Sequence, residues 1–123
     1  MEKKEQRKKV LAIRFSDQYF QCGFFEDTSP KIIIQKEPLF VAFTQTNVLH
    51  FKKALESQYG FCLMNSEEEL NKRLDAARGS VGYPVPDAVG LWCEMMIRII
   101  DASINKVKLY DYDPVGIVIS IPD

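Results

Sequence analysis

"AIRFSDQYFQCGF", residues 12–24, is the stretch that decides the expected fold of this chain. Apolar and aromatic residues run through both halves of it, and a short polar segment at residues 16–18 separates them. This pattern predicts two antiparallel strands, at residues 9–15 and 19–26, that form a hairpin. A strand–turn–strand unit at the front of a domain is where several nucleotide-binding folds hold phosphate, so the turn is the first candidate site.

The residues after this hairpin are expected to continue as strand. Residues 27–30 have the composition of a turn. KIIIQ, residues 31–35, is rich in β-branched side chains, which favours a strand. PLFVAF, residues 38–43, predicts another strand that begins at Pro38, because proline is tolerated at a strand start. The first third of the chain is therefore expected to be almost all strand.

The hydrophobic period changes in residues 44–82, which we expect to form a helical insertion. Apolar residues from Val48 to Tyr59 recur at helical spacing and predict a first helix. Gly60 suits a left-handed cap at the end of that helix. The apolar run at residues 61–64 predicts either a short strand or a linker.

A second helix is predicted from a capping box, in which the Ser66 hydroxyl accepts from a free amide and Glu69 reaches back. We expect this helix to end at Gly79, and a loop rich in glycine and proline follows at residues 79–86.

Pro86 is expected at the first position of a third helix, with Asp87 in its first turn. Most positions of this helix are apolar, and its narrow polar face is made by Asp87, Glu94, Arg98 and Asp101. A helix with so thin a polar stripe is expected to be buried over most of its circumference. The preferred interpretation is that this helix lies between a sheet and another element. The alternative is that it packs against a partner.

The end of the chain returns to strand, at residues 106–110 and 114–121. GIVISI, residues 116–121, shows little alternation, which indicates a central strand covered on both faces. A strand-rich start, then helices, then a buried strand predict one α+β domain over residues 1–123. Its mixed sheet would be covered by about three helices.

No catalytic residue or metal ligand is predicted. Cys22, Cys62 and Cys93 lie far apart among apolar neighbours, which predicts buried, reduced thiols in an intracellular protein. His50 is the single histidine and is expected on the exposed surface of the first helix, so a zinc site would lack ligands. A nucleophile, base and orienting group cannot be assembled from these residues.

Composition argues against nucleic acid and membrane as partners. The net charge of -1 provides no global electrostatic field that would attract nucleic acid or an anionic membrane. The basic run at residues 3–9 is interpreted as a solvated terminus, with contact to phosphate or an acidic partner as the alternative. No signal peptide is expected, and the most apolar stretch, residues 89–100, is too short to span a bilayer.

The order of these elements resembles the first part of the actin superfold, a ribonuclease-H-like fold. Actin-type chains open with an apolar strand, an Asp-x-Gly-Ser/Thr-Gly turn, a second strand ending in Gly-Phe, and an acidic residue and a proline before a third strand. VLAI, RFSDQ, YFQCGFFED and TSPKIII follow one another here without a gap over residues 10–34. The matching positions are Gly23, Phe24, Asp27 and Pro30.

A second set of landmarks follows the helices. Actins carry a Tyr-Pro, then a Trp-x-x-Met at the front of a helix, then a Pro-Val-led buried strand that ends in proline. The corresponding residues are Tyr83-Pro84, Trp92 to Met95, and PVGIVISIP at residues 114–122. Heat-shock chaperones share the opening spacing and a VAFT element at residues 41–44, but they match these later landmarks less well. The resemblance implies that residues 9–15 and 114–121 are neighbouring strands of one sheet. It also places residues 44–82 where actins have their small outer subdomain.

The turn that binds the ATP phosphates in actins is degenerate in this chain. Its positions are Arg14, Phe15, Ser16, Asp17 and Gln18, so both glycines and the first acidic residue are replaced. Without the glycines the backbone cannot approach phosphate closely, and the Asp17 carboxylate would repel it. Arg14 could neutralise phosphate, face solvent or pair with an acid. We expect no cofactor, and ATP remains the alternative.

The resemblance therefore implies a non-catalytic actin-related module that contacts other proteins. Its partners would be protein subunits of a larger assembly, cytoskeletal or chromatin-associated, in the cytoplasm or the nucleus. Phe15, Tyr19 and Phe25 are the candidate contact residues, unless they face the core. The alternatives are a nucleotide-binding fragment of an actin- or heat-shock-type ATPase, and a small cytosolic inhibitor or adaptor.

Overall fold

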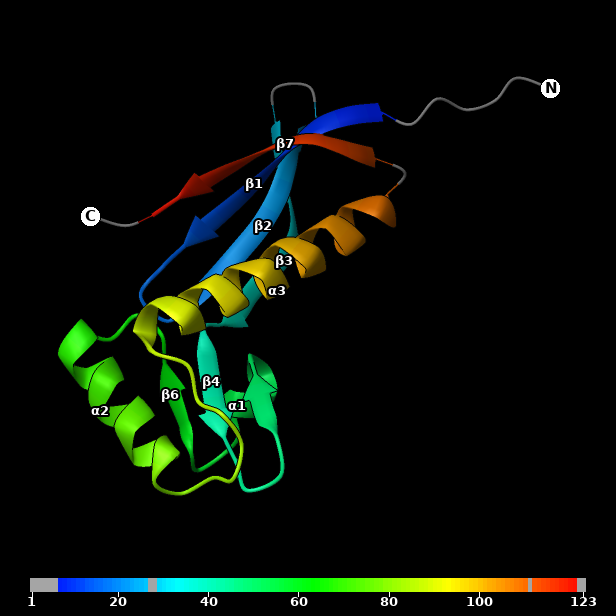
Figure 1. The fold of residues 1–123 in the computed structure, drawn as a ribbon. Coiled ribbons are helices and arrows are strands. Elements are labelled where there is room, and N and C mark those ends of the chain that lie inside the picture. The colour runs from blue at the N-terminus through cyan, green and yellow to red at the C-terminus, as the bar shows by residue number, and fades with distance from the viewer. Residues whose placement is uncertain (1–6, 27–28, 111, 122–123) are drawn as a thin grey trace.

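The computed structural model describes residues 7–26, 29–110 and 112–121, which form two lobes (Figure 1). The large lobe is a four-stranded sheet with one long helix across one face. The small lobe is a three-stranded sheet with a helix beside it and a one-turn helix at its edge. The predicted mixed α+β class is confirmed.

The large sheet has the strand order β3-β2-β1-β7. Its strands are β1 (Arg7–Phe15), β2 (Tyr19–Glu26), β3 (Ser29–Pro38) and β7 (Tyr112–Ser120). The predicted hairpin is confirmed, since β1 and β2 pair antiparallel from Leu11↔Phe24 to Phe15↔Phe20. The expected neighbours are also found, because β7 runs parallel to β1.

The ends of β3 differ from the prediction. Residues 27 and 28 of the expected turn lie outside the described residues, and β3 runs from Ser29 through the whole KIIIQ segment. Pro38 ends β3, opposite Tyr19, instead of beginning the next strand. The reason is that β4 (Phe40–Phe43) belongs to the other sheet, so the chain changes lobes at Leu39.

The helix α3 (Ala88–Lys108) covers one face of the large sheet (Figure 1). Asp87 is its N-cap and accepts a hydrogen bond from the Gly90 amide at 2.8 Å, so Pro86 precedes the cap instead of opening the helix. The strand predicted at residues 106–110 is wrong, because the helix continues through Lys108 and Val107 is buried in the core beneath it.

The predicted burial of α3 over most of its circumference is also wrong within this chain. One stripe is buried, made by Leu91, Met95, Ile99, Ser103 and Val107. Val89 and Ile97 leave 72% and 62% of their surface exposed, and Cys93 is exposed as well. The large sheet covers only one side of the helix, so the apolar residues on its outer side remain bare.

The small sheet has the strand order β5-β4-β6, formed by β5 (Val48–His50), β4 and β6 (Gly60–Cys62). The helix predicted from Val48 is wrong. Residues 48–50 pair with β4 as a strand, and only the short α1 (Lys52–Leu55) is helical. Residues 44–82 are therefore a mixed segment of two strands and two helices, not a purely helical one.

The second predicted helix is confirmed as α2 (Glu67–Arg78). The Ser66 hydroxyl caps it by accepting from the Glu69 amide at 3.2 Å. The Glu69 carboxylate accepts from Arg73 at 3.3 Å, one turn along the helix, where the prediction had it reach back toward the cap.

The two lobes share two side chains. Trp92 and Phe51 are each half-buried and pack against both hydrophobic cores. The Trp92 ring meets Phe15 of the large lobe at 6.4 Å between ring centroids. Phe51 meets Phe20 at 5.5 Å, so aromatic contacts join the lobes.

Candidate protein-interaction surface

The turn at residues 16–18 is held by internal hydrogen bonds. The Ser16 amide donates to the Tyr19 carbonyl at 2.9 Å, and the Gln18 carbonyl accepts from the Leu39 amide at 2.8 Å. The Asp17 carbonyl accepts from the Cys62 thiol at 3.5 Å, which connects the turn to the small lobe. Phosphate-binding turns present free amides from a backbone that often includes left-handed residues. Here the Ser16 amide is used, and no residue of the turn has positive φ.

Arg14 lies on the sheet face that α3 does not cover. It is opposite Gln21 on β2 and Ser120 on β7, and its side chain is exposed. With Ile32 and others it lines a hollow of about 330 Å³ on that face. Its side chain therefore lies in the sheet surface and forms no part of the hydrogen-bonded turn.

The cysteines and the histidine lie on four different elements, with Cys22 on β2, Cys62 on β6, Cys93 on α3 and His50 on β5. Cys22 and Cys62 are buried as predicted, and burial raises the pKa of both thiols, which keeps them neutral. Cys93 is exposed on α3, contrary to the prediction. His50 lies half-buried on β5 instead of on an exposed helix surface. Within the described part of the chain, no three potential metal ligands lie close together.

Two of the three aromatic residues proposed as contact surface are buried or half-buried in this chain. Phe15 is buried, with 5% of its surface exposed, so its proposed role in contact is wrong. Tyr19 is half-buried, and the Lys36 ammonium lies 5.0 Å from the centre of its ring. Phe25 pairs with Pro30 in the sheet, but its side chain lies outside the described residues.

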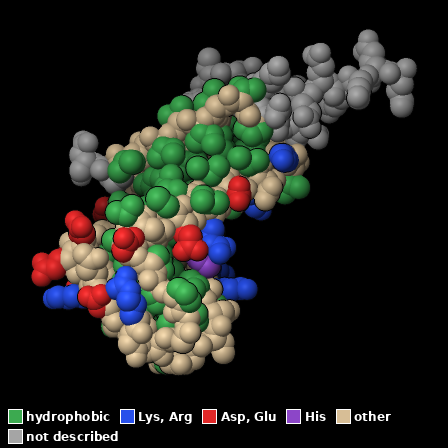
Figure 2. Space-filling model, viewed as in Figure 1, with side chains coloured by type: hydrophobic (Ala, Val, Ile, Leu, Met, Phe, Trp, Pro, Cys, Tyr) green, Lys and Arg blue, Asp and Glu red, His purple; other side chains and the backbone are tan. Residues whose placement is uncertain are grey.

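An exposed apolar surface lies instead along β7. Ile117 and Ile119 are opposite the fully buried Leu11 and Ile13 on β1, yet they leave 40% and 36% of their surface exposed. Ile121, directly after the strand, leaves 70% of its surface exposed. Figure 2 shows hydrophobic side chains gathered over the large lobe, whereas most charged side chains lie around the small lobe.

The second face of β7 is also apolar. Val118 leaves 58% of its surface exposed and continues a row across the sheet through Ala12, Gly23 and Ile32. We call the exposed apolar side chains of this strand and of the residue directly after it the β7 surface; its members are Val115, Ile117, Val118, Ile119 and Ile121.

The sequence contains a signal for this surface. The lack of alternation in GIVISI correctly indicated apolar side chains on both faces of the strand. The prediction of a covered central strand is wrong for the described residues, where β7 pairs with β1 alone and forms an edge. Continuous apolar character predicts two apolar faces, but the sequence of the strand does not specify what covers them.

The later motif residues have structural roles in this chain. The Tyr83 hydroxyl donates to the Thr44 carbonyl at 2.6 Å and holds the loop at residues 79–86 against the small lobe. Met95 is fully buried in the core of the small lobe, one turn from the shared Trp92. These contacts explain the Tyr-Pro and Trp-x-x-Met residues by packing.

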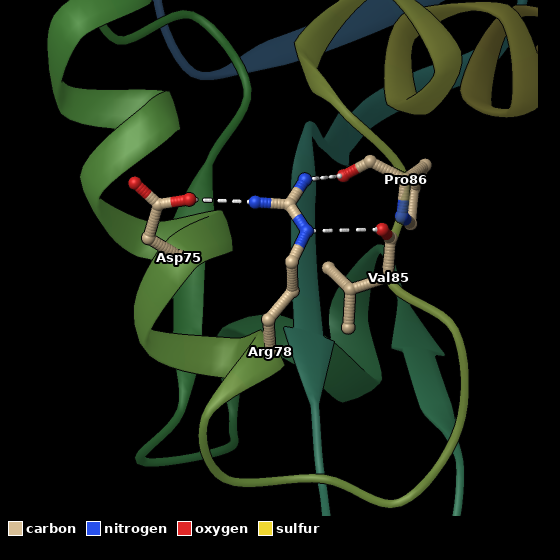
Figure 3. Close-up of polar contacts among 4 residues, drawn as sticks. All are labelled: Asp75, Arg78, Val85 and Pro86. Atoms are coloured by element: carbon tan, nitrogen blue, oxygen red, sulfur yellow. Dashed lines mark hydrogen bonds and ion pairs between the residues drawn. The ribbon is translucent and has the colours of Figure 1, made fainter.

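The α2 end of the same loop is fixed by Arg78. Its guanidinium donates to the Val85 carbonyl at 3.3 Å and to the Pro86 carbonyl at 2.9 Å, and it pairs with the Asp75 carboxylate at 2.6 Å (Figure 3). The loop that leads into α3 is thereby anchored, which fixes where the helix starts.

Comparison with other proteins adds no family assignment. None of the helices described is long and apolar enough to cross a membrane. The chain matches no known family model, and no curated protein matches it in sequence.

Proposed function

We propose that this chain is a non-catalytic, actin-related module that works by protein–protein contact as a subunit of a larger assembly, cytoskeletal or chromatin-associated. The observation that carries the proposal is the exposed β7 surface, where apolar side chains lie bare on both faces of one strand. Contiguous apolar patches of this kind mark interaction sites in folded proteins. The strand order of the large sheet supports the actin-type part of the proposal.

The state of the phosphate turn favours contact over catalysis. The Ser16 amide is bonded within the turn, the glycines are absent, and Asp17 places a carboxylate where phosphate would lie. A nucleotide-binding fragment of an actin- or heat-shock-type ATPase is the alternative. A small cytosolic inhibitor or adaptor is a further alternative. It would also bind a protein through the β7 surface, so it differs from the proposed function only in which protein it binds.

Titration calorimetry with Mg-ATP and Mg-ADP separates these functions. We expect no heat of binding up to about 1 mM nucleotide, a concentration at which even a weak site with a free energy near -4 kcal/mol would be half filled. The matched control is the double variant Ser16→Gly/Gln18→Gly, which restores the glycine positions of the turn. Sub-millimolar binding by the unmodified chain would contradict the non-catalytic proposal.

A further inference from the structure

The two edges of the large sheet differ in how they are protected. The β3 edge carries Pro30, Lys31, Lys36, Glu37 and Pro38, which are residues that discourage pairing with another strand. The β7 edge has neither charge nor proline from Val115 to Ile121. A long apolar edge without these features is a template for adding another strand.

We infer that β7 pairs antiparallel with β7 of a second copy of this chain, forming a symmetric dimer with a continuous eight-stranded sheet. This inference rests on the proposal that the chain works by protein contact. Its basis is that the edge is complementary to itself, as a two-fold axis requires.

The self-complementarity can be followed residue by residue. If Val118 lies opposite Val118 of the second copy, Ile117 lies opposite Ile119, and Gly116 lies opposite Ser120. Directly opposed residues in an antiparallel pair point to the same face. Apolar side chains therefore meet apolar side chains, and no charged residue between Val115 and Ile121 meets a like charge.

The same axis brings the α3 sides of the two copies together. A two-fold axis at the centre of an antiparallel pair is perpendicular to the sheet, so both α3 helices lie on one face of it. Ile117 and Ile119, which α3 leaves partly bare, then form one apolar strip between the two helices.

The size of this surface is near the lower limit for a dimer. Seven strand residues at about 3.3 Å each give a length of about 23 Å. A sheet and a helix layer together are about 20 Å deep. The product is about 460 Å² per copy, slightly below the roughly 500 Å² per partner at the lower limit of a specific interface, which fits a dimer of micromolar and not tighter affinity.

The test is the oligomeric state of the 123-residue chain and of charge variants on the axis. Light scattering at about 10 μM should give twice the 14.2 kDa mass of the chain, for a dissociation constant in the micromolar range. Val118→Lys and Val118→Glu should each be monomeric, with the dissociation constant raised at least about tenfold by like charges on the axis. A mixture of the two variants should form a one-to-one dimer, because lysine then meets glutamate.

The matched control is Ile32→Lys. Ile32 is on the same sheet face as Val118 and similarly exposed, at 54% against 58%, but it lies on β3 away from the axis. This variant should stay dimeric, and circular dichroism should show all four proteins folded. A monomeric unmodified chain, a dimeric Val118→Lys variant, or a mixture that does not associate would each overturn the inference.

The outcome is separate from that of the proposed function. A monomer that binds no nucleotide overturns only the dimer and leaves a different protein as the partner. Nucleotide binding by the chain overturns the non-catalytic function whether or not it dimerises.

Discussion

At Gly60 the backbone of β6 passes so close to α1 that no side chain fits. A methyl group added there would overlap the Ala54 carbonyl oxygen. The sequence suggested a left-handed helix cap at Gly60, but that interpretation is wrong, since no described glycine has positive φ. The glycine is needed for space and not for an unusual backbone angle.

We expect Gly60→Ala to lower the free energy of unfolding by about 1–3 kcal/mol, because the backbone of α1 has to shift to admit the methyl group. Urea denaturation followed by circular dichroism measures this loss. Gly82→Ala is the control, since a Cβ at Gly82 meets no atom within 4 Å, and its effect should stay within about 0.5 kcal/mol. Equal effects in both variants would contradict the packing explanation.

His50 gives the fold a dependence on pH. Burial disfavours the charged imidazole, and the Arg98 guanidinium adds repulsion, so the pKa of His50 is lowered from 6.5 in the folded state. As the pH falls below about 6.5, the unfolded chain therefore binds more protons than the folded chain. The stability contributed by neutral His50 is complete above about pH 6.5 and is lost as the pH falls through the lowered pKa of the folded state.

We expect the urea midpoint of the unmodified chain to fall more between about pH 8 and pH 5 than that of His50→Gln, which has no imidazole to protonate. The comparison cancels titrations that both proteins share. Parallel pH profiles would show that the protonation of His50 is not coupled to folding.

Signals from residues close in sequence predicted some helices and strands and missed others, because pairing between distant segments also decides which element forms. The β1–β2 hairpin and the Ser66 cap of α2 depend on residues close in sequence, and both were predicted. Apolar residues from Val48 to Tyr59 recur at helical spacing, but residues 48–50 form β5, because β4 offers backbone partners that local propensity does not include. Tertiary pairing outweighs a helix preference over so short a segment.

The anchor formed by Arg78 can be tested at this scale. Arg78→Ala removes two hydrogen bonds to the loop carbonyls of Val85 and Pro86, and we expect a loss of about 1 kcal/mol with faster amide exchange in residues 81–85. Arg73→Ala is the control, since Arg73 forms an exposed ion pair with Glu69 of its own helix. That variant should change the free energy of unfolding by no more than about 0.5 kcal/mol. Unchanged loop exchange in Arg78→Ala would contradict the anchoring role.

For the whole molecule, the shared contacts of Trp92 predict that the two lobes unfold together. We expect Trp92→Ala to cost about 2–4 kcal/mol and to reduce amide-exchange protection in both β1 and β4, because the indole packs against both cores. The neighbouring exposed Cys93→Ala is the control and should be nearly neutral. A loss of protection confined to one lobe would show that the lobes are independent.

The sequence by itself determined the strand-rich start, the capped helix α2 and the apolar character of both α3 and β7, because these depend on local composition and period. It also determined that the turn at residues 16–18 contains no glycine, although Phe15, one of the three aromatic residues proposed for contact, proved to be buried. Only the tertiary structure decided that Phe15 faces the core and that β7 lies at an edge with two bare faces. Burial depends on which elements come to lie beside a strand, and that is fixed by contacts distant in sequence.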